Sequence, residues 1–194
     1  MAVSLSKGGS VSLTKAAGTS TLTSVTVGLG WDPRAGFGAI FDLDASAIIL
    51  GSNKRALSDS DFIFYSNLTS PTGAVVHTGD NIDGEGEGDD EQIIVDLSLL
   101  PPAAISIVVI VSIDEAISRG QNFGVVDNAF IRIVNNTDGA ELARFDLTDG
   151  AMSDIAIAFG ELYLDGAEWK FRAIGDGYAG GLAEAVTAYG INVG

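Results

Sequence analysis

Apolar and polar residues alternate along much of the chain with a period of two, the spacing of a half-buried β-strand. The clearest stretch alternates four apolar side chains with Thr26, Gly28 and Gly30: Val25, Val27, Leu29 and Trp31. Further strand-like runs, several of them continuously apolar, follow at 41–45, 48–50, 62–65, 74–78, 92–97, 105–113, 129–134, 141–147, 155–164 and 168–174. Val, Ile and Thr are plentiful and favour strands, so the pattern predicts a mainly β chain.

Asp-Gly pairs separate several of these runs, at 138–139, 149–150, 165–166 and 176–177. Such pairs accept the positive φ angles of tight turns, and each therefore predicts a hairpin. The segment 162–171 (LYLDGAEWKF) is the clearest of them. About ten short strands at close spacing favour a two-sheet β-sandwich over alternating βαβ units. No Pro- or Ser-rich linker interrupts the chain, so we expect one domain over residues 1–194.

Helical patterns are few and short. Residues 113–120 suit a single helical turn that stops at Gly120, and 182–189 (LAEAVTAY) suits an amphipathic helix that stops at Gly190. Its buried stripe would consist of Leu182, Ala185, Val186 and Tyr189. The predicted fold is thus a mainly β, two-sheet β-sandwich with one or two short helices, including one at the C-terminus.

Charge and composition narrow the possible partners. The chain has 26 acidic and 10 basic residues, a net charge of −16, which repels the phosphate backbone of nucleic acid. It has no cysteine, which excludes thiolate zinc sites, disulfides and cysteine nucleophiles. No signal-peptide pattern opens the chain, and the apolar run 101–113 is too short to cross a bilayer. We therefore expect a soluble, cytoplasmic protein without direct membrane insertion, and metal cations as favoured ligands.

The segment 80–91 (DNIDGEGEGDDE) carries seven carboxylates and no Lys or Arg. Glycines at 84, 86 and 88 let the backbone curl, so several oxygens can point at one ion. Ca²⁺ takes about 6–8 oxygen ligands, whereas Mg²⁺ keeps more of its waters and Zn²⁺ prefers nitrogen and sulfur. The segment predicts a Ca²⁺ site. The alternative interpretation is a solvated acidic loop.

The pattern is not an EF-hand, because Ile94 stands twelfth from Asp83, where a bidentate Glu is required. The loop must then borrow ligands from elsewhere. Asp42 and Asp44 are the best candidates, since both would project from one face of a strand while Phe41, Leu43 and Ala45 project from the other. So many carboxylates favour two adjacent Ca²⁺ ions.

Catalytic patterns are weak. His77 is the single histidine and reads as a strand-end or loop-supporting residue rather than as a general base. Gly84–Gly88 lacks the Lys and the following helix of a phosphate-binding loop. A metal-dependent hydrolase that uses the same carboxylates remains the alternative to a non-catalytic protein.

Several blocks together resemble one known family. They are Gly28–Asp32 (GLGWD), Phe41–Ser46 (FDLDAS), Asp61–Leu68 (DFIFYSNL), Gly79–Glu91 and Asn122–Gly124 (NFG). With these blocks in this order, the chain resembles the TerD family of bacterial tellurium-resistance and stress-response proteins over essentially its whole length.

The resemblance implies a β-sandwich, Ca²⁺ binding and a non-catalytic role in bacterial stress responses such as tellurite resistance. It implies partners among the proteins of a stress-response assembly, membrane-associated ones included. Its acidic calcium motifs map onto Asp42, Asp44, Asp80, Asn81, Asp83, Glu85, Asp89, Asp90 and Glu91. Direct reduction of tellurite is not implied, because the chain offers neither a thiol nor a nucleotide-binding fingerprint.

Overall fold

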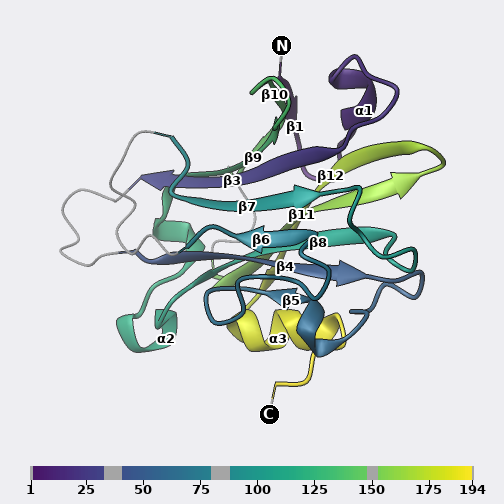
Figure 1. Cartoon of the computed structure of the whole chain (residues 1–194). Coiled ribbons are helices and arrows are strands. Elements are labelled where there is room, and N and C mark those ends of the chain that lie inside the picture. The colour runs from purple at the N-terminus through teal and green to yellow at the C-terminus, as the bar shows by residue number, and fades with distance from the viewer. Residues whose placement is uncertain (1, 33–40, 80–87, 148–152, 194) are drawn as a thin grey trace.

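The computed structural model describes residues 2–32, 41–79, 88–147 and 153–193. Its strands form two six-stranded sheets (Figure 1). Sheet A has the order β1-β10-β9-β3-β7-β6, with β1 Val3–Leu5, β10 Glu141–Asp146, β9 Asp127–Asn135, β3 Ser24–Asp32, β7 Glu91–Asp96 and β6 Val75–His77. Sheet B has the order β2-β12-β11-β8-β4-β5, with β2 Ser10–Ser12, β12 Glu168–Tyr178, β11 Ala156–Asp165, β8 Ser106–Ile113, β4 Leu43–Leu50 and β5 Phe62–Ile63.

Three helices accompany the sheets in the described part of the chain: α1 Leu13–Ala16, α2 Ala116–Arg119 and α3 Gly181–Ala188. Short 3₁₀ turns cover Asp59–Asp61 and Phe123–Val125. None of these helices is long and apolar enough to span a membrane. The predicted sandwich is confirmed, and α2 and α3 lie where the pattern placed the two short helices. The pattern did not predict α1, β1 and β2, because three or four residues are too few to show a period.

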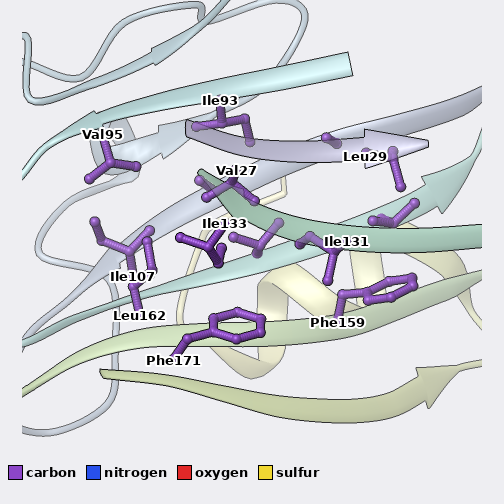
Figure 2. Close-up of a cluster of buried hydrophobic side chains, with 14 of the residues drawn as sticks. Val27, Leu29, Ile93, Val95, Ile107, Ile131, Ile133, Phe159, Leu162 and Phe171 are labelled. Carbon is purple, nitrogen blue, oxygen red and sulfur yellow. The ribbon is translucent and has the colours of Figure 1, made fainter. Parts of the chain in front are cut away.

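The core lies between the sheets, because alternate side chains of each strand point inward. Figure 2 shows this packing: Val27, Leu29 and Ile131 of sheet A face Phe159 and Phe171 of sheet B. All five are at most 3% exposed. The apolar alternation seen in the sequence is therefore the inner face of the sandwich.

A second, smaller core lies on the outer face of sheet B, where α3 packs (Figure 1). Ala185 and Val186 are buried there against Ile48 and Val108, and Leu182 and Tyr189 pack at the margin. The predicted stripe of the C-terminal helix is thereby confirmed. It explains why every residue of β4 and β8 is buried, since both faces of these strands are covered.

Three of the four hairpins predicted from Asp-Gly pairs lie within the described residues. Two of these predictions are confirmed and one is wrong. Gly139 and Gly166 have positive φ in the β9–β10 and β11–β12 turns, as predicted. Asp176-Gly177 instead lies inside β12, paired with Ala158 and Ile157 of β11. The pairing with β11 is interrupted by a bulge next to Gly175, whose φ is +72°, and β12 continues beyond it instead of turning. Gly177 has no side chain and so leaves room for the side chain of Asp154. The pair at 149–150 lies outside the described residues.

Candidate functional site

Two carboxylates lie at the beginning of β4, Asp42 just before the strand and Asp44 as its second residue. Phe41, Leu43 and Ala45 belong to the main core, and Asp42 and Asp44 alternate with them, as the sequence predicted. Both Asp side chains are nonetheless buried, each with 8% exposure. Asp44 lines a cavity of about 480 Å³ beside the first turn of α3. Burial disfavours the charged form of a carboxylate unless other groups compensate it, so these two residues are the described side chains to consider first for a cation.

Glu91, the first residue of β7, reaches across the sandwich to β4. Its Oε2 accepts a hydrogen bond from the Ala45 backbone N at 2.5 Å, and the Ala45 carbonyl lies 3.1 Å from His77 Nε2. The neighbouring strand β5 pairs with β4 only at Ala47 and Ile48. The two side chains from sheet A therefore take the place of the missing strand and join the beginnings of β4 and β7.

His77 is held by both of its ring nitrogens. Nδ1 accepts a hydrogen bond from the Gly79 N at 3.1 Å, so that nitrogen carries no proton and Nε2–H donates to the Ala45 carbonyl. Burial lowers the pKa of His77, but the Glu91 carboxylate, 3.6 Å away, and the Ala45 carbonyl raise it, and the net direction is upward. Protonation would break the Gly79 hydrogen bond. The imidazole thus supports the start of the acidic segment, as the sequence predicted.

Asp89 and Asp90 have partners of other kinds. Asp89 Oδ1 lies 2.7 Å from Arg132 Nε on β9, and its Oδ2 accepts a hydrogen bond from Gln92. A Cβ at Gly28 would lie 2.2 Å from this carboxylate, so only glycine leaves room for it above β3. Asp90 accepts a hydrogen bond from the Trp31 backbone N at 3.0 Å.

Five of the nine predicted ligands thus lie in the described residues at one end of the sandwich, but they do not share one set of contacts: Asp42, Asp44, Asp89, Asp90 and Glu91. In the described part of the chain, no three acidic or histidine side chains converge as a metal site requires. Asp80, Asn81, Asp83 and Glu85 lie outside the described residues, so their roles stay predictions. The sequence showed no sign of Arg132 or of the Ala45 backbone as partners, because neither has a motif of its own.

The chain is similar in sequence to a family model and to several proteins. The TerD domain model matches residues 1–189. A tellurium resistance protein TerD of Serratia marcescens is 55% identical over 192 residues, with 99% of each chain covered. The general stress protein 16U of Bacillus subtilis is 48% identical, with both chains fully covered. None of these names states a catalytic activity.

Two solved structures have the same fold. A crystal structure of a protein of unknown function matches with a TM-score of 0.69 and 25% identity, over 85% of this chain and 95% of the other. A telluride resistance (TerD) homologue of Streptomyces coelicolor matches with a TM-score of 0.63 and 20% identity over the same shares. The described architecture and the near-complete matches in sequence agree, and the chain belongs to the TerD family of tellurium-resistance and stress-response proteins.

Proposed function

We propose that this protein is a non-catalytic, Ca²⁺-binding stress-response module that acts through protein partners in the bacterial cytoplasm. One observation carries the proposal: Glu91, the last residue of the acidic segment, joins the beginnings of β4 and β7, so it lies at the same end of β4 as the buried Asp42 and Asp44. The donors available there are carboxylate oxygens, which fit a hard cation. Up to two ions would share the nine predicted ligands.

The described ligands divide into two groups. Asp42 and Asp44 are the side chains that we assign to Ca²⁺, since both are buried carboxylates and carboxylate oxygens are the ligands that Ca²⁺ prefers. Asp89 and Glu91 already hold protein groups, Arg132 in one case and Ala45 in the other. We infer that these two mainly fix the two ends of the site in position. A bound ion would neutralise clustered charge and join the acidic segment to β4.

The cavity beside Asp44 is the surface that we assign to a protein partner. Tyr65 and Ile117 line it and are 50% and 81% exposed, so two large side chains are accessible to a partner at the same cavity. An ion at Asp44 would set the charge of this surface. Partner capture that requires both Ca²⁺ and the Ile117 side chain, lost in Ile117→Ser, would support this assignment. Calcium-independent capture would contradict it.

The hydrolase alternative finds less support. A general base needs a nitrogen or oxygen that is available for a proton, and both ring nitrogens of His77 are engaged with the backbone. Turnover of phosphoesters with Ca²⁺, Mg²⁺ or Mn²⁺ would nevertheless revive this alternative.

The test is calorimetry on chelator-stripped protein, with the thermal midpoint measured in parallel. Saturable heat and a rise in the midpoint are expected, because an ion at about 100 times its Kd stabilises the folded state by about 2.7 kcal/mol. Asp44→Asn should weaken both effects. Asp165→Asn, which removes the same charge from the distant β11–β12 turn, should leave both intact. Absence of heat and of any shift in the wild type would refute calcium binding.

A further inference from the structure

A second cavity, of about 470 Å³, opens on the outer face of sheet B at the other end of β4. Leu50, the last residue of β4, lines it, whereas Asp44 lies six residues earlier, about 20 Å along the strand. The end of α3 and the crossing between β1 and β2 complete its walls through Tyr189, Lys7 and Gly8. This cavity is separate from the candidate calcium site.

A buried carboxylate lies at the base of the cavity. Glu161 of β11 is 3% exposed and pairs in register with Arg172 of β12. Its Oε2 lies 2.5 Å from Arg172 Nη2, and its Oε1 lies 2.5 Å from Lys54 Nζ. Lys54 and Arg172 are each about half exposed, and ion pairs with exposed partners contribute only about 0–1 kcal/mol to stability. Stability alone therefore gives little reason for charges at this position.

Lys54 reaches this carboxylate from a strained backbone. Its φ is +60°, in the left-handed region that lysine rarely occupies. The turn is fixed by hydrogen bonds from Lys54 N to the Gly51 carbonyl and from Gly51 N to the Arg55 carbonyl. The neighbouring Ala56 N donates to the carbonyl of Tyr189, which ties the turn to the end of α3. Strain of this kind is typical of functional sites.

The cavity is cationic in a strongly acidic protein. Lys7, Lys54 and Arg172 line it against Glu161 and Asp176, an excess of one positive charge where the whole chain carries −16. Neutralising Glu161 would need only one cation. Lys7 contacts the Gly175 carbonyl and Asp176 instead of Glu161. Arginine and lysine offer five and three N–H donors, more than the partners named here use.

Apolar groups line the rest of the cavity. Leu50, Val108 and Ile174 contribute aliphatic side chains, and Tyr189 contributes its ring. Burial, with the neighbouring Tyr178, raises the pKa of Tyr189, so its hydroxyl stays neutral at physiological pH. The lining therefore combines a cationic rim with an uncharged wall.

We propose that this cavity binds a small organic anion. The anionic head, a carboxylate or a phosphate, would lie among Lys7, Lys54 and Arg172, and a compact apolar body would lie against Leu50, Val108 and Ile174. Glu161 holds Lys54 and Arg172 in position and is not itself in contact with the head. The site does not depend on calcium, so its failure and that of the proposed function are distinguishable.

Titration of ¹⁵N-labelled protein, followed by ¹H–¹⁵N NMR, tests the proposal with matched probes. Benzoate and phenyl phosphate carry an anionic head and an apolar ring, benzamide has the same shape as benzoate without charge, and inorganic phosphate has no ring. Saturable shifts at the amides of Lys54, Arg172 and Gly8 are expected with benzoate, phenyl phosphate or both. Benzamide and inorganic phosphate should bind at least tenfold more weakly. The better ring-bearing anion identifies the head group. Equal binding of benzamide, or no saturable shift with either ring-bearing anion, would overturn the proposal.

Three variants of equal charge change show whether the cavity cations are responsible. Arg172→Met and Lys7→Met should weaken binding of the better probe roughly ten- to hundredfold, as loss of a charge-assisted hydrogen bond does. Lys7→Met leaves the Glu161 pairs intact, so it remains informative should Arg172→Met fold poorly. Lys170→Met, on the same strand but paired with Asp165 outside the cavity, should leave binding unchanged. Equal losses in all three variants would show a general field effect and contradict the site.

Discussion

A buried carboxylate lies near each end of β4, and the two carboxylates are held by groups of different kinds. At the beginning of the strand, Glu91 is held by a backbone N–H and faces His77, and Asp42 and Asp44 are buried at the same end. Near the end of the strand, Glu161 is held by Lys54 and Arg172, two side chains that carry full positive charge. The first end is where we propose a cation site. The second end already has its cations and favours an anion.

The number of carboxylates in a cluster is therefore a poor guide to a metal site unless the groups that balance their charge are also known. Dipoles such as backbone N–H groups satisfy hydrogen bonds but add no net charge, so a cluster held by them still attracts metal ions. Full cations cancel the charge of their partner. The same residue type can thus mark a metal site at one end of a strand and support an anion site at the other.

The largest expected effect is that of Glu91→Ala. This change leaves the Ala45 N–H without its acceptor inside the sandwich and removes the carboxylate that faces His77. The unsatisfied N–H and the cavity left by the truncated side chain together cost about 3–5 kcal/mol, and urea unfolding in the presence of a chelator measures this cost without any contribution from metal. Glu141→Ala, which loses a partly exposed pair with Arg132, should cost below about 1 kcal/mol. Similar costs for both variants would show that Glu91 does not join the sheets.

A smaller effect is expected from Gly28→Ala. The added methyl would collide with the Asp89 carboxylate and displace it from Arg132, at a cost of about 1–3 kcal/mol of unfolding free energy. A double-mutant cycle with Asp89→Ala checks the mechanism, because the cost of Gly28→Ala should largely vanish once the carboxylate is gone. If the costs of Gly28→Ala and Asp89→Ala simply add in the double mutant, the added methyl group does not act through the Asp89 carboxylate.

Gly28 also shows where sequence reasoning ends. Alternating and continuously apolar runs located every described strand except β1 and β2, because buried side chains recur along a strand at every residue or at every second residue. They also placed Asp42 and Asp44 on one face, as observed. No local pattern shows that Gly28 makes room for the carboxylate of Asp89, sixty-one residues later in the chain. No local pattern shows that the backbone N–H of Ala45 donates a hydrogen bond to Glu91. Contacts between distant segments depend on how strands are ordered in the sheets, which local patterns do not specify.

The same limit explains the cavity near the end of β4. Lys7 and Lys54 lie more than a hundred residues before Glu161 and Arg172, and all four appear in the sequence as isolated charges. Only the order β12-β11-β8-β4 and the crossing from β1 to β2 bring them together. The acidic segment, by contrast, is contiguous, and for that reason it could be recognised directly as a candidate site.

A still smaller effect is expected from Glu161→Gln. The change removes the charge but keeps the shape, and Lys54 and Arg172, each about half exposed, can turn to water. We expect a loss of about 1–2 kcal/mol, below that of Glu91→Ala, because only one partner of each pair is deeply buried. Urea unfolding at neutral pH measures it. A loss as large as that of Glu91→Ala would mean that both ends of β4 are compensated equally tightly.

The pH dependence of that loss is the finest test of the comparison. Burial raises the pKa of Glu161, but the hydrogen bonds from Lys54 and Ser106 and the charge of Arg172 lower it, and the net direction is below the ordinary value of 4.5. A depressed folded-state pKa gives stability that is fully present above the unfolded-state value and is lost as pH falls through the folded-state value. The stability difference between wild type and Glu161→Gln should therefore be constant from pH 8 to about pH 5 and shrink as the pH falls further. Unfolding curves at matched ionic strength measure it. A difference that grows on acidification would mean that Glu161 binds its proton more tightly in the folded state, and that the cations do not compensate it.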